Sequence, residues 1–78
     1  MTPVQCKMAR AGLGWNVRDL AREAKVSPDT VVRFENDVPL RERTVDAMRA
    51  ALEKAGIEFI TDNGTAEGVL LRKAQPKG

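Results

Sequence analysis

The chain has 78 residues, of which 42% are hydrophobic and 31% are charged, a composition that predicts one compact globular domain and excludes a disordered chain. Its 13 basic and 11 acidic residues leave a net charge of +2, so charge alone is weak support for a nucleic-acid partner. One cysteine and no histidine exclude an internal disulfide and argue against a zinc site or an imidazole acid/base. No apolar run is long enough for a signal peptide or a membrane span, so we expect a cytoplasmic protein. The sequence has no histidine, no phosphate loop and no nucleophile with a base, so we expect that it is not an enzyme and has no metal or cofactor.

Three residues indicate where the first predicted helix begins. Thr2 is an N-cap residue, Pro3 suits the first helical position and Gln5 completes a capping box. Gly12 and Gly14 then supply backbone freedom for a turn. The pattern predicts a helix from about Pro3 to Ala11.

Two further helices are predicted close together. Asn16 caps the second helix, with Asp19 at its third position, and this helix runs to about Ala24. Ser27 caps the third helix, which covers about Pro28 to Asn36. Apolar residues could staple each cap to its helix, Trp15 to Leu20 and Val26 to Val31. The connection of about three residues forces the two helices to cross steeply, as in a helix-turn-helix unit.

The last third of the chain changes its periodicity. A fourth helix is predicted from about Arg43 to Ala55, with Gly56 as its stop. Short strand-like runs, 57–60 and 69–71, then flank the turn signal Asp62-Asn63-Gly64. Residues 74–78 read as a disordered tail. The predicted fold is mainly α, with four helices in residues 1–56 and a C-terminal β-hairpin in residues 57–73.

The outward face of the third helix has side chains suited to reading bases in a major groove. Val31 and Phe34 would face the core. Of the outward residues, Arg33 could bind guanine, Asp29 could accept from the cytosine amino group, and Thr30 could bond a base or a phosphate. Apolar contact with a thymine methyl group could come from Val32 or Pro28. The alternative is an ordinary surface helix, in which Arg33 is merely exposed and Asp29 merely favours the helix dipole.

Residues suited to phosphate lie on either side of this helix. A helix N-terminus offers unbonded N–H groups, so the start of the second helix is one candidate position. Basic residues just beyond the third helix could hold the DNA backbone on the other side. The candidate phosphate contacts are Asn16, Arg18, Ser27, Asn36, Arg41 and Arg43.

From Gln5 to about Gly56 the chain resembles the Cro and phage-repressor family of helix-turn-helix regulators, also called the xenobiotic-response-element family. The residues that carry the resemblance are Arg10, Leu13-Gly14, Asn16, Leu20-Ala21, Val26-Ser27, Thr30-Val31 and Arg33-Phe34-Glu35-Asn36. The resemblance implies a lambda-repressor-like domain, close packing at Ala21 and an ion pair between Arg10 and Glu35. Departures from the family pattern occur at Val17, Lys25, Pro28 and Asp29, so the recognised DNA sequence cannot be carried over.

The apolar hairpin leaves two interpretations open. It could cover the helical core, or its open edges could pair with a second copy, as in small regulators that dimerise through added strands. The candidate dimer-interface residues are Ile57, Phe59, Ile60, Val69, Leu70 and Leu71. The expected function is a repressor that binds a near-palindromic operator in double-stranded DNA as a homodimer and is autoregulatory. The alternative is a protein-interaction module, antitoxin-like or anti-activator, that lost the DNA surface.

Overall fold

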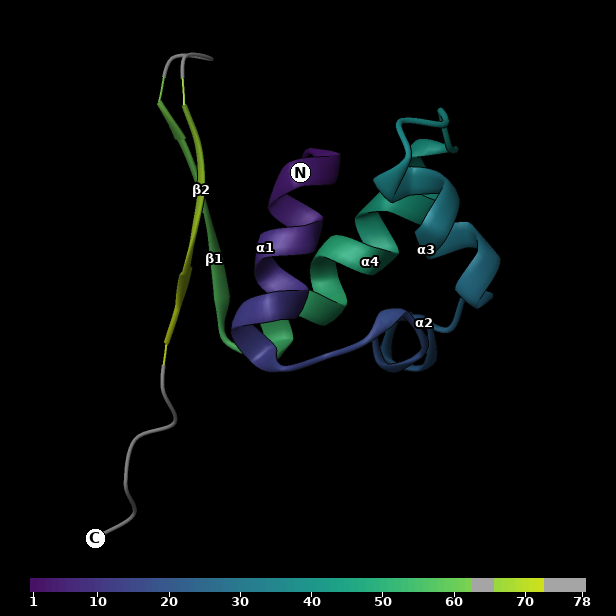
Figure 1. The fold of residues 1–78 in the computed structure, drawn as a ribbon, viewed down its shortest axis with the longest axis horizontal. Helices are drawn as coiled ribbons and strands as arrows, with labels where there is room; N and C mark the ends of the chain where they lie inside the picture. Colours follow the sequence, from purple (N-terminus) through teal and green to yellow (C-terminus); the bar gives the residue numbers. More distant parts are fainter. Residues whose placement is uncertain (63–65, 73–78) are drawn as a thin grey trace, which may run out of the picture.

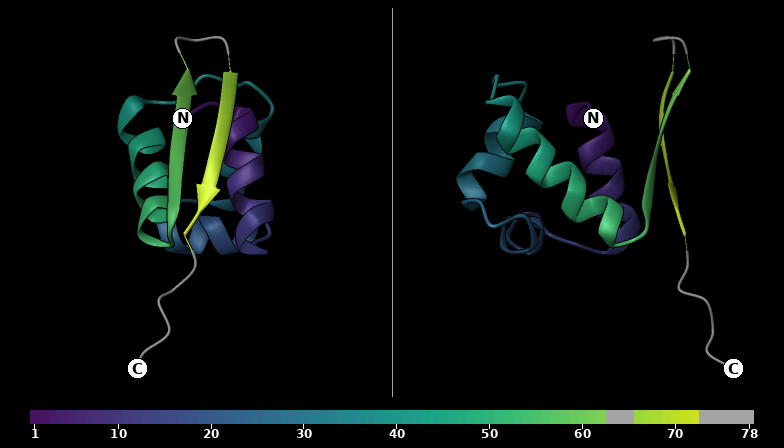
Figure 2. Two further views of the ribbon diagram at one scale, coloured as in Figure 1. Left: turned by 90° about the vertical axis from the view of Figure 1, so that its left-hand side faces the viewer. Right: turned by 180° about the vertical axis from the view of Figure 1, so that it is seen from behind.

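The computed structural model describes residues 1–62 and 66–72 and confirms a mainly helical chain that ends in a hairpin. Within these residues the elements are α1 (Pro3–Leu13), α2 (Val17–Ala24), α3 (Pro28–Glu35), α4 (Glu42–Lys54), β1 (Ile57–Asp62) and β2 (Ala66–Leu71). The hairpin lies against α1 and α4, and α3 lies on the opposite side of the molecule (Figures 1 and 2). Asn63 and Gly64 of the predicted turn, and the predicted tail, lie outside the described residues. None of the described helices has the length and apolarity to cross a membrane.

α1 is longer than expected because only one of its two candidate glycines ends it. The helix passes through Gly12 to Leu13 and stops at Gly14, which has the left-handed φ of 69°. The Gly14 N–H donates to the carbonyls of Ala11 and Arg10. The other helices begin and end within one residue of their predicted limits.

The caps of α2 and α3 form as predicted. The Asn16 side chain accepts from the Asp19 N–H, and the Asp19 carboxylate accepts from the Asn16 N–H, both at 2.9 Å. The Ser27 hydroxyl accepts from the Thr30 N–H at 3.2 Å. Between them, Lys25 adopts the left-handed conformation with φ 60°, which costs a non-glycine residue some backbone strain. In Figure 1, α2 is seen nearly end-on while α3 runs across the view, so the two helices cross steeply.

The buried core draws on all four helices and on the first strand. The partly buried side chains packed against it include Trp15, Phe59 and Val69. Ile57 is 3% exposed, so the beginning of β1 completes the helical core. The buried apolar residues are Cys6, Ala9, Leu20, Ala21, Ala24, Val31, Phe34, Met48, Leu52 and Ile57.

The hairpin is held to α1 by a buried polar side chain. The two strands pair antiparallel from Ile57↔Leu71 to Asp62↔Ala66, which makes both strands longer than predicted. Beneath them, Gln5 Nε2 donates to the carbonyls of Ile60 at 3.0 Å and Gly68 at 3.1 Å. Gln5 Oε1 also accepts from the Thr2 N–H at 3.0 Å, which closes the predicted capping box. One amide therefore caps α1 and fixes the hairpin on it.

Gly56 is required at the junction of α4 and β1. Its φ is 110°, and a Cβ at this position would lie 2.8 Å from the Arg72 carbonyl oxygen. In return, the Arg72 N–H donates to the Gly56 carbonyl at 2.8 Å. The glycine that sequence analysis assigned as a helix stop also allows the end of β2 to approach.

Replacing Gln5 by alanine should weaken the attachment of the hairpin. Gln5→Ala removes the hydrogen bonds to the Thr2 N–H and to both strand carbonyls, and we expect the free energy of unfolding to fall by about 2 kcal/mol. Urea denaturation measures this change. Lys7→Ala, at an exposed position of the same helix, should change stability by less than about 0.5 kcal/mol. Equal effects of the two substitutions would contradict the role of Gln5.

Candidate nucleic-acid interface

α3 separates its side chains into a buried and an exposed face, as its sequence predicted. Val31 and Phe34 are buried, and Glu35 joins them with 7% exposure. The candidate base-reading residues lie on the other face, where Thr30 is half-buried and the rest, Pro28, Asp29, Val32 and Arg33, are exposed. The structure thus brings all five residues together on one accessible helix surface.

Two polar contacts organise this exposed face. The Ser27 and Thr30 hydroxyl oxygens lie 2.8 Å apart, so these side chains bond to each other while Ser27 also caps the helix. In the same first turn, Asp29 Oδ2 lies 3.5 Å from Nε of Arg33, which is one turn further along the helix. The hydroxyls are therefore partly engaged within the chain, whereas the outer end of the Arg33 side chain is turned to solvent.

The candidate phosphate contacts flank α3 at exposed positions. Arg18 is the second residue of α2. Arg41 is the N-cap of α4 and Arg43 is its second residue, and the first turn of α4 lies beside the end of α3 (Figure 1). None of these three arginines forms an ion pair with another described residue. Asn36 is the exposed C-cap of α3. These positions leave positive charge available on both sides of the helix.

The start of α2 is less suited to phosphate than the sequence indicated. The Asn16 side-chain oxygen is used by the Asp19 N–H, and the Asp19 carboxylate sits on the Asn16 N–H at the same helix end. That carboxylate brings negative charge to the helix terminus and repels a phosphate. From Asn16 to Arg43 the chain carries as many acidic as basic residues, so general attraction to DNA is weak there.

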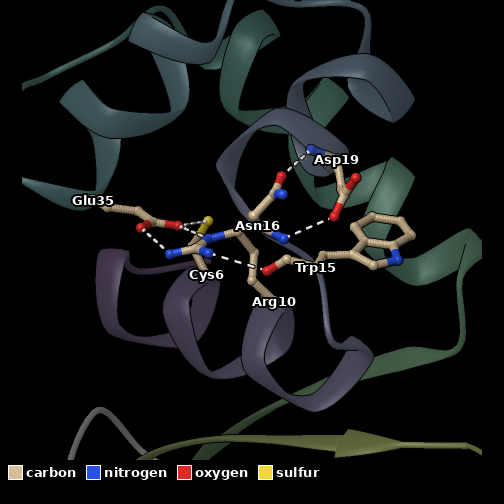
Figure 3. Close-up of polar contacts among 6 residues, drawn as sticks. All are labelled: Cys6, Arg10, Trp15, Asn16, Asp19 and Glu35. Carbon is tan, nitrogen blue, oxygen red and sulfur yellow. Dashed lines mark hydrogen bonds and ion pairs between the residues drawn. The ribbon is translucent and has the colours of Figure 1, made fainter.

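An ion pair between α1 and α3 holds the interface from behind (Figure 3). Arg10 Nε and Nη2 donate to the two Glu35 carboxylate oxygens, each at 2.6 Å. Arg10 Nη1 also donates to the Trp15 carbonyl at 3.2 Å, in the segment before α2. This is the pair that the family resemblance implied. Two parallel bonds join α1 to α3, and the third bond joins the same guanidinium to the segment before α2.

Burial and charge shift the pKa values in this cluster. Burial of Glu35 would raise its pKa, but hydrogen bonds from Arg10 and Cys6, with the Arg10 charge, lower the pKa below the ordinary range. The Cys6 thiol donates to Glu35 at 3.2 Å, and its burial together with this bond raises the pKa of Cys6 to about 12. The structure adds a neutral thiol donor to the ion pair.

The Arg10–Glu35 pair should make stability depend on acid pH. The pKa of Glu35 is lower in the folded state than in the unfolded state. The contribution of the ion pair to stability is therefore complete above the ordinary carboxyl pKa range, and it is lost as the pH falls through the lower pKa of the folded state. Glu35→Gln should therefore cost about 2 kcal/mol near neutral pH and flatten the loss of stability below about pH 4. Urea denaturation across this range measures both effects.

A matched control for Glu35→Gln is available on α4. Glu53 forms an exposed ion pair with Arg49 at 3.2 Å, and Glu53→Gln should cost less than about 0.5 kcal/mol at any pH. If Glu35→Gln left the acid branch of the stability curve unchanged, titration of Glu35 would not be its cause.

The structure corrects the predicted dimer interface at Ile57. That side chain is buried in the core of its own chain, since it is the first inward-facing residue of β1. Phe59 and Val69 pair across the hairpin and also pack against the helical core. Ile60, Leu70 and Leu71 remain exposed, so the hairpin uses about half of its apolar residues to cover α1 and α4.

Comparisons with protein-family models and with curated proteins gave no match.

Proposed function

We propose that the chain is a sequence-specific double-stranded DNA-binding regulator, a cytoplasmic repressor that reads its operator with α3. The observation that carries the proposal is the α2–α3 unit, in which two capped, steeply crossing helices present Arg33 and four neighbours on one exposed face. An exposed helix with such side chains fits a major groove. The four-helix arrangement and the Arg10–Glu35 pair support assignment to the lambda-repressor-like, xenobiotic-response-element family.

The distribution of charge supports a particular kind of DNA binding. Arg18, Arg41 and Arg43 can contact phosphates on both sides of α3, whereas the acidic residues between them limit attachment to arbitrary sequences. Non-specific affinity comes chiefly from phosphate neutralisation, so it should be low for this protein. Recognition then depends on the fit of α3 to bases.

Selection of binding sites from random duplexes tests the proposal. The wild-type protein should enrich one motif, and Arg33→Ala should weaken binding to it by about 1–3 kcal/mol with loss of preference at one base pair. Arg33→Lys should lose the same preference, because lysine keeps the charge but not the two parallel donors. Titration against salt should show a linear loss of affinity that reflects the phosphate contacts.

Arg49→Ala is the control for these variants because Arg49 lies over the Phe59 ring, 5.5 Å from its centroid, on the hairpin side. It should leave the selected motif unchanged. Enrichment of no sequence by the wild-type protein would contradict the proposal and favour the protein-interaction module, which the balanced charge also fits. Uniform weakening by Arg33→Ala on every sequence would make Arg33 a phosphate contact.

The second part of the proposal is a homodimer on an inverted repeat. Two α3 helices can read one operator only if they meet the same side of the DNA, about 34 Å apart. The outer face of the hairpin lies on the side away from α3 (Figures 1 and 2), so two copies joined face to face there would turn their α3 helices away from each other. The outer face of the hairpin is therefore unsuited to an operator-binding dimer.

The side of the molecule where α1 lies beside β2 meets this geometric requirement (Figure 2). A two-fold axis perpendicular to the hairpin along that side leaves both α3 helices on the side opposite the strands. Gln5 marks the face of α1 that meets the hairpin. Val4 is about 100° around the helix from Gln5, in one stripe with Met8 and Ala11. Val4 and Leu71 are 49% and 42% exposed. We therefore propose this side as the dimer interface.

Val4→Glu should separate the dimer without unfolding the protein. Val4 is the second residue of α1, where a carboxylate favours the helix dipole, so stability should not fall. Analytical ultracentrifugation should find wild-type dimers and variant monomers at the same concentration. Val38→Glu, at a 41% exposed valine beyond α3, should leave the wild-type dimer intact. A dimer unaffected by Val4→Glu would place the interface elsewhere.

A further inference from the structure

An ion pair lies on the surface of α3 that the proposed function turns toward DNA. Asp29 Oδ2 is 3.5 Å from Arg33 Nε, and the Arg33 and Asp29 side chains are 61% and 77% exposed. We infer that Asp29 is a positioning residue, which holds the Arg33 guanidinium for a guanine of the operator and does not itself read a base. This inference rests on the proposed DNA-binding function.

The geometry of the guanidinium group supports this division of roles. The printed contact of Asp29 is with Nε, on the side of the guanidinium, and neither terminal amino group of Arg33 forms a hydrogen bond with another described residue, so both can bind a partner. Guanine presents O6 and N7 as two neighbouring acceptors in the major groove, and arginine donates to both in parallel. The contact with Asp29 therefore leaves open the end of Arg33 that guanine requires.

The same carboxylate also discriminates against the wrong sequence. In free protein the pair is solvated and weak, but DNA that closes over α3 removes water and strengthens the attraction between the two charges. The Asp29 carboxylate repels the phosphates of any duplex, and only a duplex that offers a guanine to Arg33 offsets this repulsion with a favourable base contact. Asp29 should thus raise the selectivity for guanine and lower the affinity for arbitrary DNA.

Asp29→Asn tests the inference on three kinds of duplex. These are the duplex that the wild-type protein selects, the same duplex with the guanine opposite Arg33 replaced by each other base, and a random-sequence duplex. The preference for guanine should fall about tenfold while affinity for the random duplex rises. Asp29→Glu should restore most of the preference, because a longer carboxylate still reaches Arg33 across one helical turn.

Glu53→Gln is the matched control, since it breaks an ion pair of the same spacing and alters net charge equally. Glu53 and Arg49 are each 47% exposed on α4, and Arg49 lies over Phe59 of β1. This variant should leave the preference for guanine unchanged. Adding Asp29→Asn to Arg33→Ala should cause no further loss of that preference, because Asp29 acts through Arg33.

Each remaining outcome overturns the inference in a recognisable way. An unchanged guanine preference in Asp29→Asn would make the pair a support of the helix alone. Loss of preference at a different base pair would show that Asp29 reads that base itself. A wild-type protein that selects no sequence would overturn the proposed function as well, whereas a selected motif with either of the first two results overturns only the positioning role.

Discussion

The two hydrogen bonds from Arg10 to Glu35 set the position of α3 relative to the rest of the chain. Glu35 is the last residue of α3, and Arg10 reaches it from α1 while also holding the carbonyl of Trp15. A carboxylate with 7% exposure cannot stay charged without such partners, so the pair is needed once Glu35 is buried. The orientation of the exposed face of α3, and any site formed on it, depends on this contact.

Local signals in the sequence were sufficient to predict the elements. The caps at Thr2, Asn16 and Ser27 were found because each cap bonds to a residue three positions on, and such contacts form wherever the helix forms. Gly12 and Gly14 could not be told apart by composition, since either permits a turn. The helix ends at Gly14, and the Trp15 N–H that follows caps it by donating to the Arg10 carbonyl at 2.8 Å.

Contacts between distant segments could not be predicted in the same way. The bonds from Gln5 to Ile60 and Gly68 span 55 and 63 positions, and they exist only once the hairpin lies on α1. Alternation along β1 predicts two faces but does not say which one is covered, so Ile57 was expected at a dimer interface. The Arg10–Glu35 pair was expected only through family resemblance, because no spacing rule links residues 25 positions apart.

The separation of α3 from the hairpin has a consequence for how this protein can change. Pro28, Asp29, Val32 and Arg33 are exposed, and none is among the buried residues that form the core. Substitutions there and in the hairpin lie on opposite sides of the helical core, so their effects should combine independently (Figure 1). Divergent copies of this chain can therefore acquire new surface chemistry on α3 one residue at a time while the scaffold stays constant.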